Sequence, residues 1–434
     1  MIVKGNLISG LNRPLLARDC SASIVTMNRI SIDLQAYTAL ACGNFYEELI
    51  AVSSSLKILR LASDHSTKPR GDSMELSPRY WAKKISQKLG LAGSPALYYL
   101  APGASWSLDW DGHYITRDMQ TRHGLPARVV HNAAQLVGQI VHYGSLWGTV
   151  GNLGLRHNRD NFTVSTIFHG DPSLEPFEAP IQQVLDHLGE LDYLHTASQM
   201  METRFLEWGI PREKVVRIPL GVDLQIFKPR DEHAKRWKRQ ERGIPEDVFC
   251  IGSFQKDGAG MAEGEQPKPI KGPDVLLDVI KQLHANYPIF VLLSAPARGY
   301  VKRGLDDLSV PYKHVVEEDY ERIPELFAAI DAYLLTSREE GGPKGVLEAL
   351  ASGVPFVGTR VGLVPDVVTQ GRDGFYAESE DVDSLAALVA RLIEDRELGQ
   401  SLARAGLETI QDYDWTLIAD RYYQDIYRPL LERA

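Results

Sequence analysis

Residues 332–359 read AYLLTSREEGGPKGVLEALASGVPFVGT, and this stretch predicts the fold of the chain. The run 332–337 is short and apolar, as expected of a buried strand, whereas the apolar spacing over 346–351 is that of a helix. Gly353 and Pro355 mark the end of this helix, because glycine and proline commonly follow a helix C-terminus. A strand therefore leads through a glycine-rich loop into a helix, which is the repeating unit of an α/β fold.

The same alternation of apolar strands and helices extends over most of the chain. The predicted strands are 96–102, 138–144, 162–171, 191–198, 248–254, 289–296, 332–337 and 355–359. Helical patterns lie between them, for example at 272–284 and 323–329. Short apolar strands separated by helices are typical of parallel sheets covered by helices, so the predicted class is α/β.

The length of the chain and one charged segment predict two such domains. A chain of 434 residues is longer than one ordinary hydrophobic core supports. Over residues 218–247 a strand-like end is followed by a glycine, a proline and a run of charged residues, which marks a domain boundary. We therefore expect one domain over 95–228, a second domain over 229–410, and a closing helix over 411–434.

Residues 1–94 form an N-terminal extension whose structure the sequence does not predict. Its last part, 77–91, has Ser77 as a helix N-cap, a proline in the first turn and several basic residues. Two interpretations of this basic amphipathic helix stay open. It is either an ordinary surface helix, or a helix that docks on a membrane or an acceptor through Trp81 and Ile85.

Composition excludes several classes of protein. The 44% apolar and 24% charged residues are typical of a soluble globular protein, and a formal net charge of -10 argues against extended binding of nucleic acid. The three cysteines are far apart and none has CxxC spacing, so we expect a reducing compartment. No apolar run approaches the roughly 18–20 residues that span a bilayer, and residues 1–20 lack a secretory apolar core. The sequence predicts a cytoplasmic protein, with peripheral contact at the inner membrane face as an alternative.

The glycine-rich loop has the composition of an anion site. Gly341, Gly342 and Gly345 lack Cβ atoms, so the backbone can approach a phosphate closely. The loop enters a helix N-terminus, where backbone N–H groups and the helix dipole attract negative charge. Glu340, at the strand end, is placed for a sugar hydroxyl, and Glu348, inside the helix, is placed for ribose hydroxyls. The alternative is an ordinary loop between strand and helix with solvated acids.

At these residues the chain resembles the family 4 glycosyltransferases of the GT-B fold. Glu340 and Glu348 match the E-x7-E signature of that family, and further similar segments are 209–229, 270–280, 347–368 and 371–377. The resemblance covers about residues 95–434 and implies two Rossmann-like domains that face each other across a cleft. It also implies a retaining hexosyltransferase of carbohydrate or polysaccharide biosynthesis. Such an enzyme uses a nucleotide diphosphate sugar as co-substrate and is expected to need no cofactor or metal.

The resemblance assigns roles to residues on the donor side. The residues expected to bind the donor are Ser253, Lys256, Lys271, Gly342, Pro343, Lys344, Gly345, Val346 and Glu348. Lys271 and Glu340 are also expected to take part in catalysis. Ser253 departs from the family pattern, which usually has arginine there, and Lys271 follows only after the insertion 255–270. We expect Lys256 to supply the missing cation; the alternative is a solvated loop lysine.

Three residues of the N-terminal domain are candidates for the other side of the cleft. His169 lies at the end of the predicted strand 162–171, and the resemblance places it near the transferred sugar in a catalytic role. Asp171 would support His169, and His142 is a second acceptor-side candidate. A histidine at a strand end is also commonly structural.

Two D-x-D strings occur, DWD at 109–111 and DYD at 412–414. In the other glycosyltransferase fold such a pair binds the divalent metal that holds the diphosphate. We expect instead that the first string lines the acceptor cleft and that the second starts a helix.

Two other functions stay open on the sequence alone. The first is an isomerase of the same fold, such as a nucleotide-sugar epimerase. The second is a catalytically silent protein that binds a nucleotide sugar, an interpretation that Ser253 in place of arginine favours. The expected partners are a nucleotide-sugar donor and a carbohydrate or lipid-linked acceptor, and the base, the sugar and the acceptor are not predicted.

Overall fold

The computed structural model describes residues 78–88, 93–103, 107–260 and 263–434. The predictions for Ser77 and for the extension before it lie outside the described residues. The described part from residue 78 onward belongs to one compact unit, which spans Asp72–Ala434.

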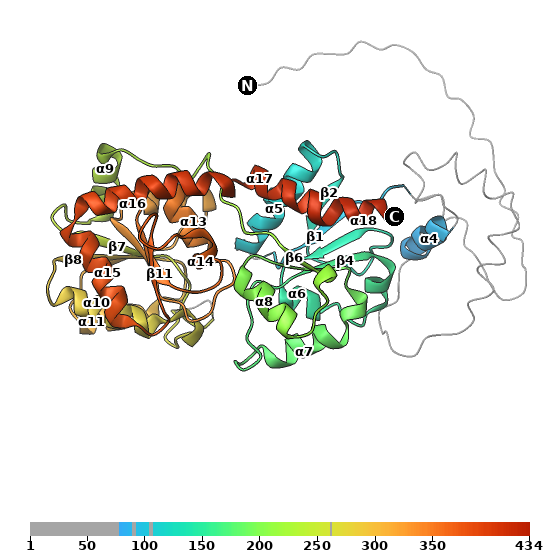
Figure 1. The fold of residues 1–434 in the computed structure, drawn as a ribbon, viewed down its shortest axis with the longest axis horizontal. Helices are drawn as coiled ribbons and strands as arrows, with labels where there is room; N and C mark the ends of the chain where they lie inside the picture. Colours follow the sequence, from blue (N-terminus) through green and yellow to red (C-terminus); the bar gives the residue numbers. More distant parts are fainter. Residues whose placement is uncertain (1–77, 89–92, 104–106, 261–262) are drawn as a thin grey trace, which may run out of the picture. The chain divides into compact units, whose positions relative to one another are not determined.

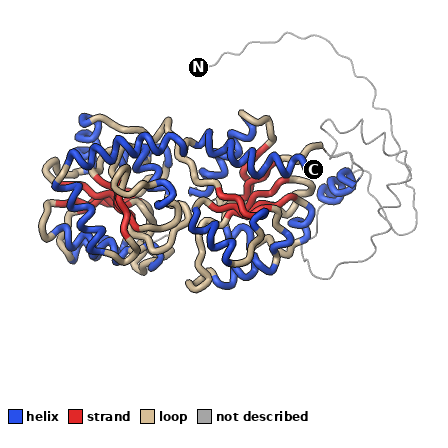
Figure 2. The backbone as a smooth tube through the Cα atoms, in the orientation of Figure 1, coloured by secondary structure: helices blue, strands red, loops and turns tan. Residues whose placement is uncertain are grey.

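Two six-stranded parallel sheets form the centre of this unit (Figure 2). The strands of the first sheet are β1 (Leu97–Leu100), β2 (Ala127–Val130), β3 (Ile140–Tyr143), β4 (Phe162–Thr166), β5 (Tyr193–Thr196) and β6 (Val215–Arg217). They are arranged in the order β2-β1-β3-β4-β5-β6. The accompanying helices are α4 (Pro78–Lys88), α5 (Ser107–Thr121), α6 (Leu146–Val150), α7 (Glu178–Asp186) and α8 (Gln199–Glu207).

The second sheet repeats this architecture in the C-terminal half. Its strands are β7 (Phe249–Ser253), β8 (Ile289–Ser294), β9 (Tyr312–Val315), β10 (Ala332–Leu335), β11 (Phe356–Thr359) and β12 (Phe375–Ala377), in the order β12-β11-β10-β7-β8-β9. The helices of this half are α9 (Glu232–Arg242), α10 (Pro273–His284), α11 (Gly299–Asp307), α12 (Pro324–Phe327), α13 (Lys344–Ala351), α14 (Val364–Val367), α15 (Val382–Glu394) and α16 (Arg396–Thr409). The predicted α/β class with two Rossmann-like domains is confirmed.

The inner strands form because most of their residues are apolar and nearly all are buried. Every residue of β1, β3, β8, β10 and β11 is buried. Parallel sheets carry helices on both faces, so both sides of such a strand must avoid water. The helices supply the covering layer: α10 begins at Pro273, where proline suits the first turn, and buries an apolar face.

The C-terminal segment runs from the second half back to the first (Figure 1). After α16 it continues as α17 (Trp415–Tyr422), a π-helical turn (Tyr423–Tyr427) and α18 (Arg428–Glu432). The indole of Trp415 in α17 stacks on Tyr114 of α5 at 5.2 Å between ring centroids. The DYD string does start a helix, because the Asp414 side chain caps α17 by accepting a hydrogen bond from the Thr416 N–H. The expected single closing helix is therefore a set of consecutive helical pieces.

A buried polar network fixes this segment to the first sheet. His142 shares hydrogen bonds with the Tyr427 hydroxyl at 2.6 Å and the Thr166 hydroxyl at 2.7 Å. Thr166 also contacts His195 at 2.8 Å, and His195 contacts the Tyr422 hydroxyl at 3.1 Å. Burial lowers the pKa of both histidines, that of His195 to about 4, so both rings are neutral at pH 7. All five side chains are buried, and the network replaces the water that they lose.

Helix α4 lies within the predicted basic helix 77–91. Tyr80 is fully buried, and both Tyr80 and Lys84 bond to Asp160 of the first half. Trp81 and Ile85 are half-buried. The structure thus places α4 against the protein through Tyr80, and docking on a membrane or an acceptor stays untested. Over the described residues, no helix has the length and apolar character that crossing a bilayer requires.

Candidate active site

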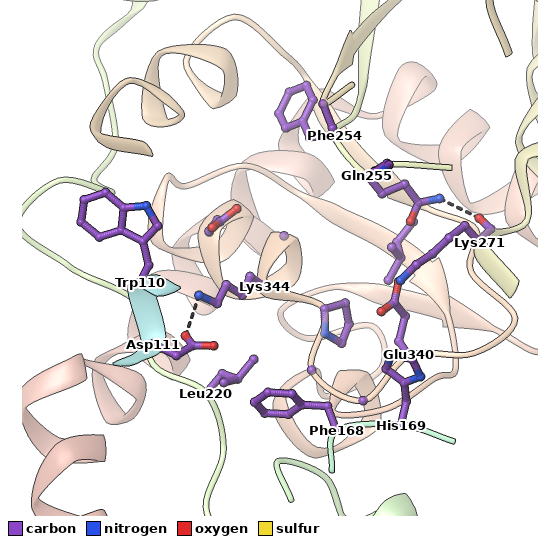
Figure 3. Close-up of a pocket in the computed structure, with 18 of the residues that line it drawn as sticks. Trp110, Asp111, Phe168, His169, Leu220, Phe254, Gln255, Lys271, Glu340 and Lys344 are labelled. Carbon is purple, nitrogen blue, oxygen red and sulfur yellow. Dashed lines mark hydrogen bonds and ion pairs between the residues drawn. The ribbon is translucent and has the colours of Figure 1, made fainter. Parts of the chain in front are cut away.

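A cavity of about 580 Å³ lies where the strand ends of the two sheets meet (Figure 3). The first half contributes Phe168 and His169, which follow β4, and the second half contributes the loop 340–345, which follows β10. Parallel α/β sheets bind ligands outside the carboxyl ends of their strands, because loops and helix N-termini meet there. The cavity therefore has the position of a binding site in such a fold.

Two glycines of the loop are required by close contacts. A Cβ on Gly341 would lie 1.7 Å from the carbonyl oxygen of Phe168, and a Cβ on Gly345 would lie 2.3 Å from the Tyr333 hydroxyl. Any larger residue at Gly341 would push the backbone of this loop away from the backbone at Phe168. Both glycines line the cavity together with Gly342 and with Lys344, the first residue of α13. The predicted order of strand, glycine loop and helix is found in the structure.

The carboxylate of Glu340 lies in this cavity and is held by two partners. Glu340 Oε1 accepts hydrogen bonds from Lys271 Nζ at 2.6 Å and from Ser337 Oγ at 2.8 Å. Burial alone would raise the pKa of Glu340, but the charge and hydrogen bond of Lys271 outweigh it and hold the pKa below its usual range. Gln255 steadies the pair, since it donates to the Lys271 carbonyl at 2.7 Å (Figure 3). Glu340 and Lys271 are therefore an ion pair at pH 7.

Glu348 also lines the cavity, but one of its oxygens already has a partner. Glu348 Oε1 accepts a hydrogen bond from the Tyr320 hydroxyl at 2.8 Å. Burial raises the pKa of Glu348, with Tyr320 and Lys344 acting in the opposite direction. The Tyr320 ring lies 5.1 Å from Trp110 of the first half. A ribose at Glu348 would share this carboxylate with Tyr320 or displace its hydroxyl.

Besides Lys344, three lysines of the second half line the cavity, namely Lys256, Lys268 and Lys271. Burial lowers the pKa of Lys268, and the positive charges of Lys256 and Lys271 lower it further. Lys268 was not among the residues predicted for the site, although it lies three positions before Lys271 in the same proline-containing stretch. Glu340 already compensates Lys271, and an anion bound near Lys256 and Lys268 would relieve the remaining repulsion.

The insertion 255–270 supplies two of these lysines from its two legs. Gly258 pairs with Pro267 in an antiparallel bridge, which brings the flanking Lys256 and Lys268 to the same end. The insertion is anchored by Asp257, which forms a fully buried ion pair with Arg298 at 2.9 Å. The residues that seemed to interrupt the family pattern thus build part of the cavity.

Ser253 is not at the cavity, in contrast to the expectation that it binds the donor. Its carbonyl and its hydroxyl accept hydrogen bonds from Arg298 at 2.6 and 3.1 Å, and its side chain is buried. The insertion and Arg298 cover the end of β7, which explains why this position is closed to a ligand. Pro343 lies in the loop and lines the cavity. Val346, which was also expected to bind the donor, is buried in the first turn of α13 and does not line the cavity.

The first half brings His169 to the cavity but not the other two candidates. Burial, and then the positive charge of Lys271, lowers the pKa of His169, so the ring is neutral at pH 7. His142 is fully buried in the network below the sheet, because β3 is an inner strand covered on both faces. Asp171 accepts hydrogen bonds from Ser173 and lies 3.9 Å from Arg204, outside the cavity lining. The structure therefore does not place His142 or Asp171 on the acceptor side of the cavity.

The DWD string lies on α5 and partly at the cavity. Trp110 and Asp111 line it, and Asp111 forms an ion pair with Lys344 at 2.6 Å (Figure 3). Asp109 accepts a hydrogen bond from the Gly103 N–H instead. Residues two apart on a helix do not face each other, so the two carboxylates do not form one site. Within the described ranges no group of three or more His, Cys, Asp or Glu side chains is arranged to hold a metal ion.

The sequence model of the family described as "Glycosyl transferases group 1" matches residues 262–395. The chain is also 25% identical over 329 residues to a D-inositol 3-phosphate glycosyltransferase of Corynebacterium urealyticum, a match that covers 71% of this chain and 73% of that protein. It is 26% identical over 242 residues to a GDP-mannose-dependent alpha-(1-6)-phosphatidylinositol monomannoside mannosyltransferase of Mycolicibacterium smegmatis, covering 52% and 59%.

The chain is a glycosyltransferase, and its residues 262–395 are similar to group 1 of these enzymes.

Solved structures show which fold this glycosyltransferase has. The HepE protein of Anabaena, solved in complex with UDP-glucose, aligns with a TM-score of 0.62 at 19% identity and covers 77% of this chain and 100% of its own. The sucrose-phosphate synthase of Thermosynechococcus elongatus aligns with a TM-score of 0.58 at 16% identity, covering 82% and 93%. The two sheets and their connection are therefore the GT-B fold. The family match includes Lys271 and the glycine loop of this glycosyltransferase, and its assignment to family 4 stays a prediction.

Proposed function

We propose that this glycosyltransferase moves a hexose from a nucleoside diphosphate sugar to an acceptor hydroxyl, with retention of the anomeric configuration. The observation that carries the proposal is the Lys271–Glu340 ion pair at 2.6 Å, in one cavity with the glycine loop. A bound diphosphate requires nearby cations and backbone N–H groups that can approach it closely, and a bound sugar requires a charged acceptor for the hydrogen bonds of its hydroxyls. Both requirements are met there by residues that the resemblance had assigned to the donor.

The donor is proposed to lie with its diphosphate between the lysines and the loop. Lys256, Lys268 and Lys271 face it from the insertion side, and residues 342–345 face it from the N-terminus of α13. The ribose lies toward Glu348, and the hexose lies toward Glu340 and His169. This donor class is supported by the HepE structure, which is a complex with UDP-glucose, and by the mannosyltransferase, which is GDP-mannose-dependent.

In the proposed reaction, the bond between the anomeric carbon and the diphosphate oxygen breaks as the acceptor oxygen bonds to the same face. The leaving phosphate oxygen takes the proton of the acceptor hydroxyl, so no separate strong base is needed. The lysines stabilise the negative charge that develops on the diphosphate. Neutral His169 is proposed to orient the sugar, and the proposal uses no metal or cofactor.

Thermal shift with UDP, GDP, ADP and dTDP, each with its common sugar nucleotide, tests donor binding. We expect one nucleotide series to raise the melting temperature, and we expect NMR of the glycoside product to show the anomeric configuration of the donor. Binding of no nucleotide sugar would refute the transferase proposal. An inverted product would refute the retaining mechanism alone, and a free epimeric nucleotide sugar would favour the isomerase.

A further inference from the structure

The cationic side chains at the cavity come from one wall, which also contributes Glu317, Glu318, Glu340 and Glu348. Each lysine among the described lining residues, namely Lys256, Lys268, Lys271 and Lys344, comes from the second half, and no arginine lines the cavity there. The wall from the first half consists of aromatic, aliphatic and small polar side chains with Asp111 and His169. Lys344 is paired with Asp111, and His169 is neutral at pH 7. The acceptor side therefore offers no cation of its own to a phosphate.

Trp147 is the exposed member of the acceptor-side wall. Its side chain is 54% exposed, although it lines the cavity together with Ser145 and Leu146. Six large apolar side chains of the described residues are exposed, and Trp147 is the one among them that lines the cavity. A half-exposed indole at the edge of a cavity offers its ring face to a ligand in that cavity.

The turn that carries Trp147 is held firmly. Leu146 is buried in the core of the first half, and the Ser145 hydroxyl accepts a hydrogen bond from the Gly148 N–H at 3.1 Å. The hydroxyl of buried Thr149 contacts Ser165 of β4 at 2.7 Å. The indole is thus presented on a fixed backbone, which lowers the entropy that a stacking contact costs on binding.

The chemistry of this wall selects among acceptor classes. A phosphorylated acceptor would bring negative charge to a wall without an available cation, and the desolvated phosphate would stay uncompensated. A neutral pyranose suits it, because its C–H face can lie on the electron-rich face of an indole. Its hydroxyls can meet the polar groups of Ser145, His169 and Asp111 at the same wall.

We infer that the acceptor of this glycosyltransferase is a neutral pyranoside whose ring stacks on Trp147, and that phosphate-bearing acceptors are rejected. The inference rests on the proposed transferase function and adds the acceptor class to it. It distinguishes this chain from the similar D-inositol 3-phosphate glycosyltransferases, whose name includes a phosphate.

The test compares full-length Trp147→Ala, Trp147→Phe and wild type. The donors are UDP-glucose, GDP-mannose, ADP-glucose and dTDP-glucose, and the acceptors are methyl pyranosides, inositol 3-phosphate and phosphatidylinositol in detergent. We expect transfer to at least one methyl pyranoside, with an acceptor KM that rises at least tenfold in Trp147→Ala and is largely restored in Trp147→Phe. Trp237→Ala is the matched control, because Trp237 is 60% exposed on α9 and lies outside the cavity lining.

The possible outcomes distinguish a failure of the acceptor inference from a failure of the proposed transferase function. If nucleotide sugars bind and are slowly hydrolysed but no methyl pyranoside is glycosylated, the acceptor inference is overturned and the donor proposal survives. Transfer to inositol 3-phosphate alone, or to the lipid alone, overturns it equally. An unchanged acceptor KM in Trp147→Ala removes the stacking role. If no nucleotide sugar binds, both proposals fail together.

Discussion

The two walls of the cavity are built in different ways. The donor-side wall takes its charged residues mainly from two short segments, 255–271 and 340–348, which fold into local turns. The acceptor-side wall takes two or three neighbouring residues each from α5, the start of α6 and the loop after β4, and single residues elsewhere. Local segments can be recognised in a sequence as motifs, whereas scattered positions cannot. The donor side of such an enzyme can therefore be predicted from the sequence more readily than its acceptor side.

The largest effect is expected from the anchor of the donor-side wall. Arg298→Ala should lower the free energy of unfolding by about 3–5 kcal/mol, because it leaves the buried carboxylate of Asp257 uncompensated. Urea denaturation measures this change, and Arg303→Ala, an exposed position on the same helix, is the control. A loss as small as that of the control would show that the insertion does not depend on this ion pair.

The next effect concerns catalysis. Lys271→Ala should lower the turnover number by roughly 100- to 1000-fold, because it removes a cation from the developing diphosphate charge and leaves Glu340 unpaired. Steady-state kinetics measure it, with Lys313→Ala on the edge strand β9 as control. A near-normal rate would place the phosphates elsewhere.

A smaller effect is expected on donor affinity. Glu348→Ala should raise the dissociation constant of the nucleotide sugar roughly tenfold, the range of a hydrogen bond to a charged group. Tyr320→Phe frees the same carboxylate from its internal partner and sharpens the test. If the ribose takes over that oxygen, Tyr320→Phe should preserve or improve affinity, and unchanged affinity in Glu348→Ala would remove its ribose role. Calorimetric titration separates these results.

The acceptor-side half should lose stability in acid. The folded-state pKa of His195 is about 4, below its value of about 6.5 in the unfolded chain, so the unfolded state binds the proton first. Stability is therefore full above about pH 6.5 and declines as the pH falls toward 4. His142 contributes in the same direction. Thermal melts of His195→Gln against wild type over this range check it, and parallel curves would exclude the network as the cause.

The smallest effect is expected on removing metals. Excess EDTA should leave the transfer rate within about twofold, since lysines and a helix N-terminus are proposed to carry the diphosphate charge. The measurement is activity after dialysis against the chelator, with and without added Mg²⁺ or Mn²⁺. Complete loss that Mg²⁺ restores would contradict the metal-free mechanism and return attention to Asp111.

Burial explains which strands could be predicted. The eight predicted strands include the inner ones, such as β8, whose residues are all buried and therefore apolar. The four strands that were missed, β2, β6, β9 and β12, are the four edge strands of the two sheets. An edge strand is partly exposed, and β9 contains lysine and histidine, so its pattern does not stand out from a loop.

The residues of the site also divide into those that could be predicted from the sequence and those that could not. The glycine loop, Glu340 and Lys271 could be predicted because each belongs to a contiguous motif. Lys268 and Tyr320 could not, since their place at the cavity depends on the folding of the insertion and of a 3₁₀ turn. His142 was expected in the site because a histidine near a strand end looks functional, and only the sheet order shows that it is enclosed.

The contact between Val222 and Asp414 has a mechanical consequence. The chain passes between the halves once after β6 and again before α17, and these two passages run side by side. The Val222 N–H donates a hydrogen bond to the Tyr413 carbonyl at 2.9 Å, and the Trp415 N–H donates one to the Val222 carbonyl at 3.1 Å. Two chain segments that are hydrogen-bonded to each other bend together about one axis more easily than they twist relative to each other. Gly221, whose Cβ would lie 2.6 Å from the Trp415 ring, allows them to lie this close. We therefore expect the two passages to bend together in any opening of the enzyme for substrate exchange.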